Sequence, residues 1–157
     1  MGLDTTHGAW HGAYGAFHRW RQRIARLAGF PQLDLMEDFW SGRGIAGGDM
    51  QFDHLPCDWD GSTAEAQRYW LTARDELPLK WTDSEGDRRL LPLLRHSDCD
   101  GDLPPAHCAM IADALEEILP RLDGECGGHI GNWQEKTKAF IAGCRAAAAA
   151  GERIEFH

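Results

Sequence analysis

The chain has 157 residues and a formal net charge of −9 at pH 7. This length fits one ordinary domain, and a hydrophobic content of 43% with seven tryptophans can form a sizeable core. The negative charge argues against a non-specific nucleic-acid binder and against a protein of anionic membranes, because both need surplus Lys and Arg. We therefore expect a single globular domain over residues 1–157 and do not expect nucleic acid as a partner.

The sequence also predicts the cellular compartment of the protein. No stretch approaches the roughly 18 consecutive apolar residues of a membrane span, and the first residues lack a charged-then-apolar signal pattern. The five cysteines stand at wide spacings without a Cys-x-x-Cys pair, which is typical of reduced thiols. The sequence thus predicts a cytosolic (cytoplasmic) protein without a membrane partner, and it leaves homo-oligomer formation open.

The first predicted element is a helix over residues 8–28. Its inward stripe recurs at spacings of three and four and consists of Trp10, Tyr14, Phe17, Arg21, Ile24 and Ala28. His7, His11 and His18 line one edge of this stripe if the helix begins early enough to include His7. Gly29 is expected to end the helix, with Pro31 just beyond.

The middle of the chain is predicted to be less regular. Residues 33–40 are expected to form two helical turns, and residues 42–61 a long glycine-rich loop. A capping box opens a helix predicted over residues 62–76. Two short apolar runs within residues 79–94 flank a turn-like segment and suggest a hairpin, whose second run contains Pro92 and is therefore an edge strand or an extended segment.

The last third is predicted to be mainly helical. Pro104 and Pro105 suit the first turn of a helix, whose core stripe is Cys108, Ile111, Leu115, Ile118, Leu119 and Leu122. A second glycine-rich loop over 123–131 precedes a helix over 132–150, which is expected to bury Trp133, Phe140, Ile141 and Cys144. Residues 153–157 alternate as a strand that could pair with either run of the hairpin. The predicted fold class is mainly α (α+β), with three or four long helices and a small two- or three-stranded sheet.

The stretch from Arg95 to Asp102 is the densest in chemistry, because it holds an imidazole, three carboxylates and a thiol. The spacing of His96, Asp98 and Asp100 resembles a divalent-metal loop, in which alternate side chains converge on one cation. The EF-hand pattern fails, however, because the position of its bidentate Glu is Ala109. Capping of the next helix by these acids and direct catalytic use of His96 or Asp98 are the alternatives.

A histidine pair near the start of the chain suggests a second chemistry. His7 and His11 are four residues apart, which places two imidazoles on one helix face as in zinc sites, although the Glu of His-Glu-x-x-His is missing. The alternative is a partly buried edge of the core. Asp4 could orient an imidazole or act as a third ligand. The candidate ligands of a divalent metal are therefore Asp4, His7, His11, His96, Asp98 and Asp100.

The leading functional hypothesis is a small-molecule-binding protein whose ligand is phosphorylated or nucleotide-like. Arg and His on the first helix would meet phosphate, and Trp59 could stack on a base or sugar. The residues assigned to this site are His7, His11, Tyr14, His18, Arg21, Trp59, Arg95, His96 and His157. A metal-dependent hydrolase and a protein-interaction module are the alternatives, so the sequence leaves open whether the protein is an enzyme. The P-loop, Rossmann and nucleophile-elbow motifs are missing from the sequence.

Three motifs carry a resemblance to a known group of proteins. They are Gly2-Leu3-Asp4-Thr5-Thr6-His7 continuing to Arg19-Trp20-Arg21, His96-Ser97-Asp98-Cys99-Asp100-Gly101, and Glu155-Phe156-His157. Together they resemble a family of uncharacterised small bacterial and phage-encoded proteins, across nearly the whole chain. Where the family pattern has Glu after Asp-Gly, this chain has Asp102. The resemblance implies an association with phage genomes, a setting in which small proteins often bind host-made molecules such as nucleotide-derived immune signals.

Overall fold

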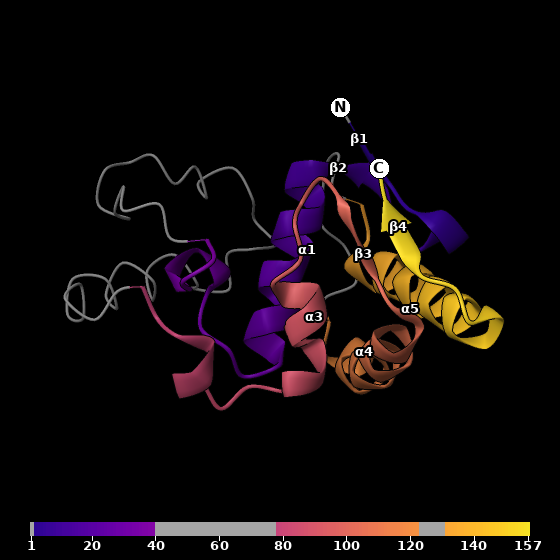
Figure 1. Cartoon of the computed structure of the whole chain (residues 1–157). Coiled ribbons are helices and arrows are strands. Elements are labelled where there is room, and N and C mark those ends of the chain that lie inside the picture. The colour runs from indigo at the N-terminus through magenta and orange to yellow at the C-terminus, as the bar shows by residue number, and fades with distance from the viewer. Residues whose placement is uncertain (1, 40–77, 123–130) are drawn as a thin grey trace.

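The computed structural model describes residues 2–39, 78–122 and 131–157 of the chain (Figure 1). Several predictions lie outside these residues. They are the glycine-rich loop over 42–61 with Trp59, the helix over 62–76, and residues 123–130 of the second glycine-rich loop.

Helices dominate the described residues. The α-helices are α1 (Tyr14–Leu27), α3 (Leu91–Leu94), α4 (Pro105–Ile118) and α5 (Trp133–Ala150). Short 3-10 helices join them: η1 (Thr6–Gly8), η2 (Leu33–Leu35), η6 (Trp81–Asp83), η7 (Arg88–Leu90) and η8 (Leu119–Arg121). With two small sheets, this arrangement confirms the predicted mainly α class.

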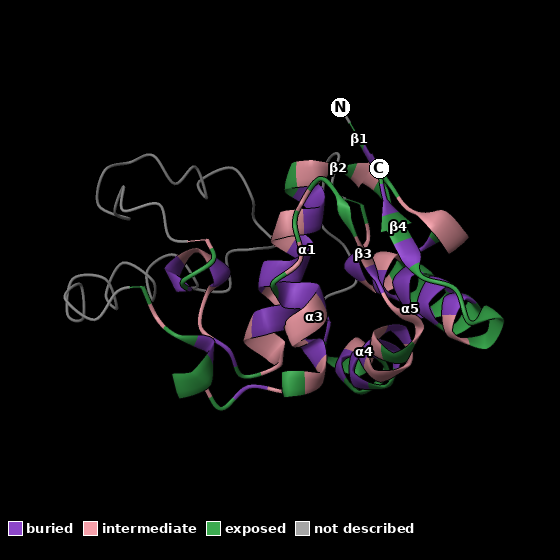
Figure 2. Ribbon diagram, in the orientation of Figure 1, coloured by how far each residue is buried: buried purple, intermediate pink, exposed green. Residues whose placement is uncertain are grey.

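Helix α5 begins and ends, and α4 begins, where their local signals predict, but α4 ends at Ile118, before Leu119 and Leu122 of its predicted stripe. Pro105 is the first residue of α4, where a missing N–H costs nothing. The Asn132 side chain caps α5 by accepting a hydrogen bond from the Glu135 N–H at 3.1 Å, and Gly151 ends it with a left-handed φ of 68°. The two helices pack together, with Cys108 and Cys144 fully buried as predicted. Figure 2 shows the buried residues running through α1, α4 and α5.

The predicted start of the first helix is wrong. Strands β1 (Gly2–Asp4) and β2 (His11–Ala13) form an antiparallel hairpin, and α1 begins only at Tyr14. The chain reverses between Asp4 and His11, where His7 and Gly8 have φ angles of 57° and 63°, in the left-handed region that an α-helix does not use. His7 and His11 therefore do not share a helix face.

A second small sheet joins the two ends of the described chain. Strand β3 (Gly101–Leu103) pairs antiparallel with β4 (Ile154–Phe156). The other edge of β4 meets the first hairpin, because Thr5 bridges Phe156 and Asp4 exchanges backbone hydrogen bonds of 3.2 and 2.9 Å with His157. Figure 1 shows β1 beside β4. The last strand thus pairs with residues 101–103 and not with the apolar runs at 79–94.

The predicted hairpin within residues 79–94 is also wrong, since this segment forms η6, η7 and α3. The Asp87 carboxylate accepts a hydrogen bond from the Arg89 N–H at 3.0 Å, which starts the helical stretch. Leu90, Leu93 and Leu94 are all fully buried. Their spacing of three and four residues matches one helix face, so apolar burial favours the helix over an extended run.

None of the helices formed by the described residues is long and apolar enough to span a bilayer.

Candidate functional site

Arg21 lies on the inner face of α1 and is completely buried. Its guanidinium donates hydrogen bonds to the carbonyl oxygens of Leu93 at 3.2 Å and Leu94 at 3.4 Å, at the end of α3, and to the carbonyl of His96. It also forms an ion pair with Asp98. These bonds satisfy orphan carbonyls at a helix terminus and attach the 95–101 loop to α1. The guanidinium of Arg21, predicted to meet a phosphate, is thus buried and bonded to groups of the protein itself.

His18 extends this cluster one turn earlier on α1. Its Nε2 is 3.1 Å from Asp34 Oδ1, and its Nδ1 is 3.4 Å from Asp98 Oδ2. Gln22 donates a second hydrogen bond to Asp34, at 2.5 Å. With Arg21 and His18 charged, two cations meet two carboxylates, so the cluster is neutral overall. A buried cluster of this kind is stable only when its charges are paired.

The electrostatics of the cluster keep His18 protonated. Burial opposes the charged imidazole, but the hydrogen bond to Asp34 and the charges of Asp34 and Asp98 outweigh it and raise the pKa of His18 to about 9. Burial lowers the pKa of Arg21 to about 10, against the attraction of Asp98, so Arg21 stays charged at neutral pH. Burial would raise the pKa of Asp98, but His18 and Arg21 hold it below its usual value.

Stability should fall as pH rises from 6.5 to 9. The pKa of His18 is higher in the folded protein than its ordinary 6.5, so its contribution is complete below pH 6.5 and is lost as pH rises through about 9. The shift corresponds to roughly 3 kcal/mol of unfolding free energy. Urea unfolding of wild type and His18→Gln at several pH values between 6.5 and 9 measures this contribution to the free energy of unfolding. The difference between the two should shrink with pH, and parallel curves would contradict the assignment.

The 95–101 loop is held by further contacts of its own. The His96 ring packs on Phe156 with centroids 4.1 Å apart, and its Nδ1 is 2.9 Å from the Ser97 carbonyl oxygen. The Ser97 hydroxyl donates to Asp100 Oδ1 at 2.6 Å. Arg95, a predicted ligand-binding residue, instead points to Asp38, with Nε 2.7 Å from Oδ2. Ser97 and Asp100 thus shape the loop, and Arg95 ties it to the segment after η2.

His7 lies apart from this cluster, in an open pocket of about 450 Å³. Its Nε2 is 3.1 Å from Glu152 Oε2. The pocket is lined by Thr6, His7, Pro105, Gly151, Glu152, Arg153 and Glu155, from the hairpin turn, the start of α4 and the segment between α5 and β4. Its volume falls within the range of about 300–1,000 Å³ that is usual for small-molecule sites.

His11 lies at a third location, on the outer face of the hairpin formed by β1 and β2. Its Nδ1 is bonded to the carboxylate of Asp4, directly opposite on β1. Both side chains are largely exposed, at 86% for His11 and 65% for Asp4. His157 pairs with Asp4 from the other side through the backbone.

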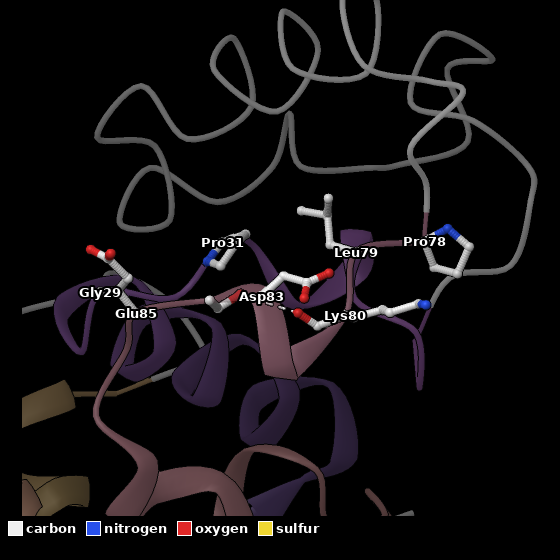
Figure 3. Close-up of a pocket in the computed structure, with 8 residues that line it drawn as sticks. Gly29, Pro31, Pro78, Leu79, Lys80, Asp83 and Glu85 are labelled. Carbon is white, nitrogen blue, oxygen red and sulfur yellow. Dashed lines mark hydrogen bonds between the residues drawn. The ribbon is translucent and has the colours of Figure 1, made fainter.

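A second pocket, of about 580 Å³, lies beside η6 (Figure 3). Pro31, Pro78 and Leu79 provide apolar walls. Figure 3 shows the ammonium group of Lys80 well apart from the carboxylate of Asp83, so the two do not converge on one ligand group. This pocket therefore has the size of a ligand site without an organised set of polar contacts.

The predicted site residues thus separate into three places. The structure brings together His18, Arg21, Asp98 and the backbone of His96, as predicted for the contact of the first helix with the 95–102 loop. It separates His7 and His11 from them. Among the described residues, no three His, Cys, Asp or Glu side chains are gathered to hold a metal ion, so the six predicted metal ligands do not form one site.

Comparisons with models of protein families, with curated proteins and with solved structures found no match.

Sequence reasoning missed Asp34, Gln22 and the pocket residue Arg153. Asp34 sits in a short 3-10 helix, and no spacing in the sequence connects it to His18. Arg21 did carry a signal, because it stands in the apolar stripe of α1, where a charge must be buried and paired. Tyr14, another predicted ligand residue, is half-buried at the start of α1, and Trp59 lies outside the described residues.

Proposed function

We propose that the protein binds a small phosphorylated, nucleotide-like molecule in the pocket beside His7. The observation that supports this most is the pocket itself, which is lined by His7, by Arg153 and by Pro105, the first residue of α4. The positive end of a helix dipole favours anionic groups, and Arg binds phosphate with bidentate geometry. These three features support the proposal of a phosphate group in this pocket.

The acids in the pocket make a complete nucleotide a better ligand than a bare phosphate. Glu152 and Glu155 line the same pocket, and carboxylates accept hydrogen bonds from ribose hydroxyl groups and from amino groups of bases. A nucleotide supplies both an anion for Arg153 and donors for the two glutamates. Host-made cyclic nucleotides belong to this class, which fits the phage association that the sequence resemblance implies.

Thermal-shift screening and calorimetry test the proposal. The panel contains mononucleotides, cyclic dinucleotides, phosphorylated metabolites and inorganic phosphate. A ligand at 100 times its Kd should stabilise the native state by about 2.7 kcal/mol. Arg153→Ala should weaken binding tenfold or more, because it removes the cation at the pocket.

Arg145→Ala is the matched control. Arg145 is similarly exposed and also forms carboxylate pairs, with Asp113 at 2.6 Å and Glu116 at 3.0 Å, but it does not line the pocket. Its loss should leave binding unchanged. Arg153 pairs with Asp102 at 2.8 Å, so both variants break a surface ion pair. The absence of any stabilising nucleotide, or equal affinity of wild type and Arg153→Ala, would count against the proposal.

A further inference from the structure

The thiols of Cys108 and Cys144 meet in the core, between α4 and α5. Cys108 belongs to the first turn of α4 and Cys144 to the middle of α5, and both residues are fully buried. Each thiol is a hydrogen-bonding partner of the other. The core therefore holds two neighbouring nucleophilic groups.

The packing of the two helices supports this contact independently of the thiols. The Gln134 side chain, near the start of α5, donates a hydrogen bond to the Leu122 carbonyl oxygen, beyond the end of α4, at 2.8 Å. Farther along α5, Arg145 pairs with Asp113 at 2.6 Å, farther back on α4. The two helices are thus antiparallel. Their register carries Cys144, the neighbour of Arg145, toward the beginning of α4.

Cys108 is the more reactive of the two thiols. Its Sγ donates a hydrogen bond to the Leu103 carbonyl oxygen at 3.4 Å and is also bonded by the Ile154 N–H. The hydrogen bonds with Cys144 and with the Ile154 N–H lower the pKa of Cys108, although burial alone would raise it. The contact with Cys108, and then burial, raise the pKa of Cys144. Cys108 is therefore the thiol that becomes a thiolate, which is the nucleophilic form.

We propose that Cys108 and Cys144 are a redox-sensitive pair, which a hydroperoxide converts into a disulfide between α4 and α5. Disulfides in reducing compartments are usually transient and serve catalysis or redox sensing. Neither cysteine lines the pocket beside His7, so the pair can respond to peroxide with or without a nucleotide.

The oxidation takes two steps and consumes one peroxide. The Cys108 thiolate attacks a peroxide oxygen, so that an S–O bond forms, the O–O bond breaks, and the leaving hydroxide takes up the proton that Cys108 released. The Cys144 sulfur then attacks the Cys108 sulfenic acid. The S–S bond forms, the S–O bond breaks, and the departing hydroxide accepts the Cys144 proton. Two thiols and one peroxide thus give one disulfide and two waters, and two electrons pass from sulfur to oxygen.

Both sulfurs are buried, so peroxide reaches them when the structure opens locally. Cys108 lies beside the end of the β3–β4 pair, where β3 leads directly into α4. An opening there exposes Cys108 while the rest of the helix pair stays packed. The reaction should therefore be slow and respond to sustained peroxide, whereas the exposed Cys99 is oxidised first.

Peptide mass mapping of the Cys99→Ser variant after treatment with hydrogen peroxide tests the proposal. Cys99 is exposed, so its replacement spares the core, and the tryptic peptide 96–121 then has Cys108 as its one cysteine. Peptide 139–145 contains Cys144. The native protein should yield these two peptides linked, about tenfold or more above any other link of either cysteine, because proximity replaces chance encounter. Dithiothreitol should separate them.

The same oxidation in urea is the control for proximity. Cys126 stands midway between Cys108 and Cys144 in the sequence, so links to Cys126 are favoured in an unfolded chain by their shorter loops. If native and unfolded protein gave the same mixture of links, the proposal would be overturned. It would equally fail if native protein gave no link between peptides 96–121 and 139–145.

Two further variants of the Cys99→Ser protein test the order of attack, and circular dichroism checks that each folds. In Cys144→Ala, the sulfenic acid of Cys108 has lost its partner thiol and should be labelled by a 1,3-diketone reagent. In Cys108→Ala, labelling at Cys144 should fall by about tenfold, because this thiol stays protonated. Equal labelling of the two variants would contradict the role of Cys108 as the attacking thiolate. The mapping of Cys99→Ser decides on the pair itself even where neither variant folds.

Discussion

Replacing Arg21 with alanine is expected to lower the free energy of unfolding by about 4 kcal/mol, the range found when one partner of a buried ion pair is removed. The guanidinium is fully buried and bonds the end of α3 and Asp98 at once. It also lies over the Phe17 ring, 4.7 Å from the centroid. Its loss leaves Asp98 with His18 as its remaining charged partner, leaves carbonyl groups unsatisfied and opens a cavity.

Chemical denaturation of wild type and three variants, Arg21→Ala, Arg95→Ala and Arg21→Lys, measures this effect. Arg95→Ala is the matched control, because Arg95 also pairs with one aspartate but is 49% exposed, and such surface pairs contribute about 0–1 kcal/mol. Arg21→Lys keeps the charge but lacks the planar fork that reaches several acceptors, so its loss should be intermediate. If Arg21→Ala were no more destabilised than Arg95→Ala, the cluster would not hold the 95–101 loop.

Replacing Gly143 with alanine is expected to cost roughly 3 kcal/mol, although alanine is the better helix former by about 1 kcal/mol. A Cβ at this position would lie 2.5 Å from Ala9 Cβ and 2.6 Å from Ala9 Cα. The Ala9 backbone cannot rotate away from the added Cβ as a long side chain could, so α5 and the hairpin turn must move apart. The turn carries Thr6 and His7, and their pocket should widen with it.

The helix-propensity contribution can be measured separately. Ala142 is the exposed neighbour on α5, and Ala142→Gly should cost about 1 kcal/mol from propensity alone. Ala9→Gly combined with Gly143→Ala should recover part of the loss, because it removes the 2.5 Å contact and leaves the backbone contact. A Gly143→Ala variant as stable as wild type would show that α5 and the turn are not in such close contact.

The two long helices α4 and α5 were predictable because their signals are local. Pro105, Asn132 and Gly151 act on residues within one turn of themselves, and the apolar stripes between them match the buried residues. The hairpin was not predictable from the same reasoning, because the histidine spacing also fits a helix. The positive φ of His7 and Gly8 is one feature that separates the two structures, and Gly8 is a residue whose type favours it.

The candidate site was predictable only where the chemistry of the side chains indicated a contact. The contact between α1 and the 95–102 loop was expected from their chemistry, and Asp98 does meet His18 and Arg21. The opposite pairing of Asp4 with His157 depends on strand register between segments about 150 residues apart, which no local pattern encodes. Arg153 was missed because a single exposed arginine carries no pattern of its own.

The pairing of residues 4 and 5 with residues 156 and 157 also has a kinetic consequence. Closing so long a stretch of chain costs on the order of 4 kcal/mol of entropy when it is the first contact made. That cost falls once α1, α4 and α5 are already packed, because they bring the hairpin and β4 together. The contact between residues 4–5 and residues 156–157 should therefore form late in folding and open early in the native protein, and the pocket beside His7 lies next to this contact.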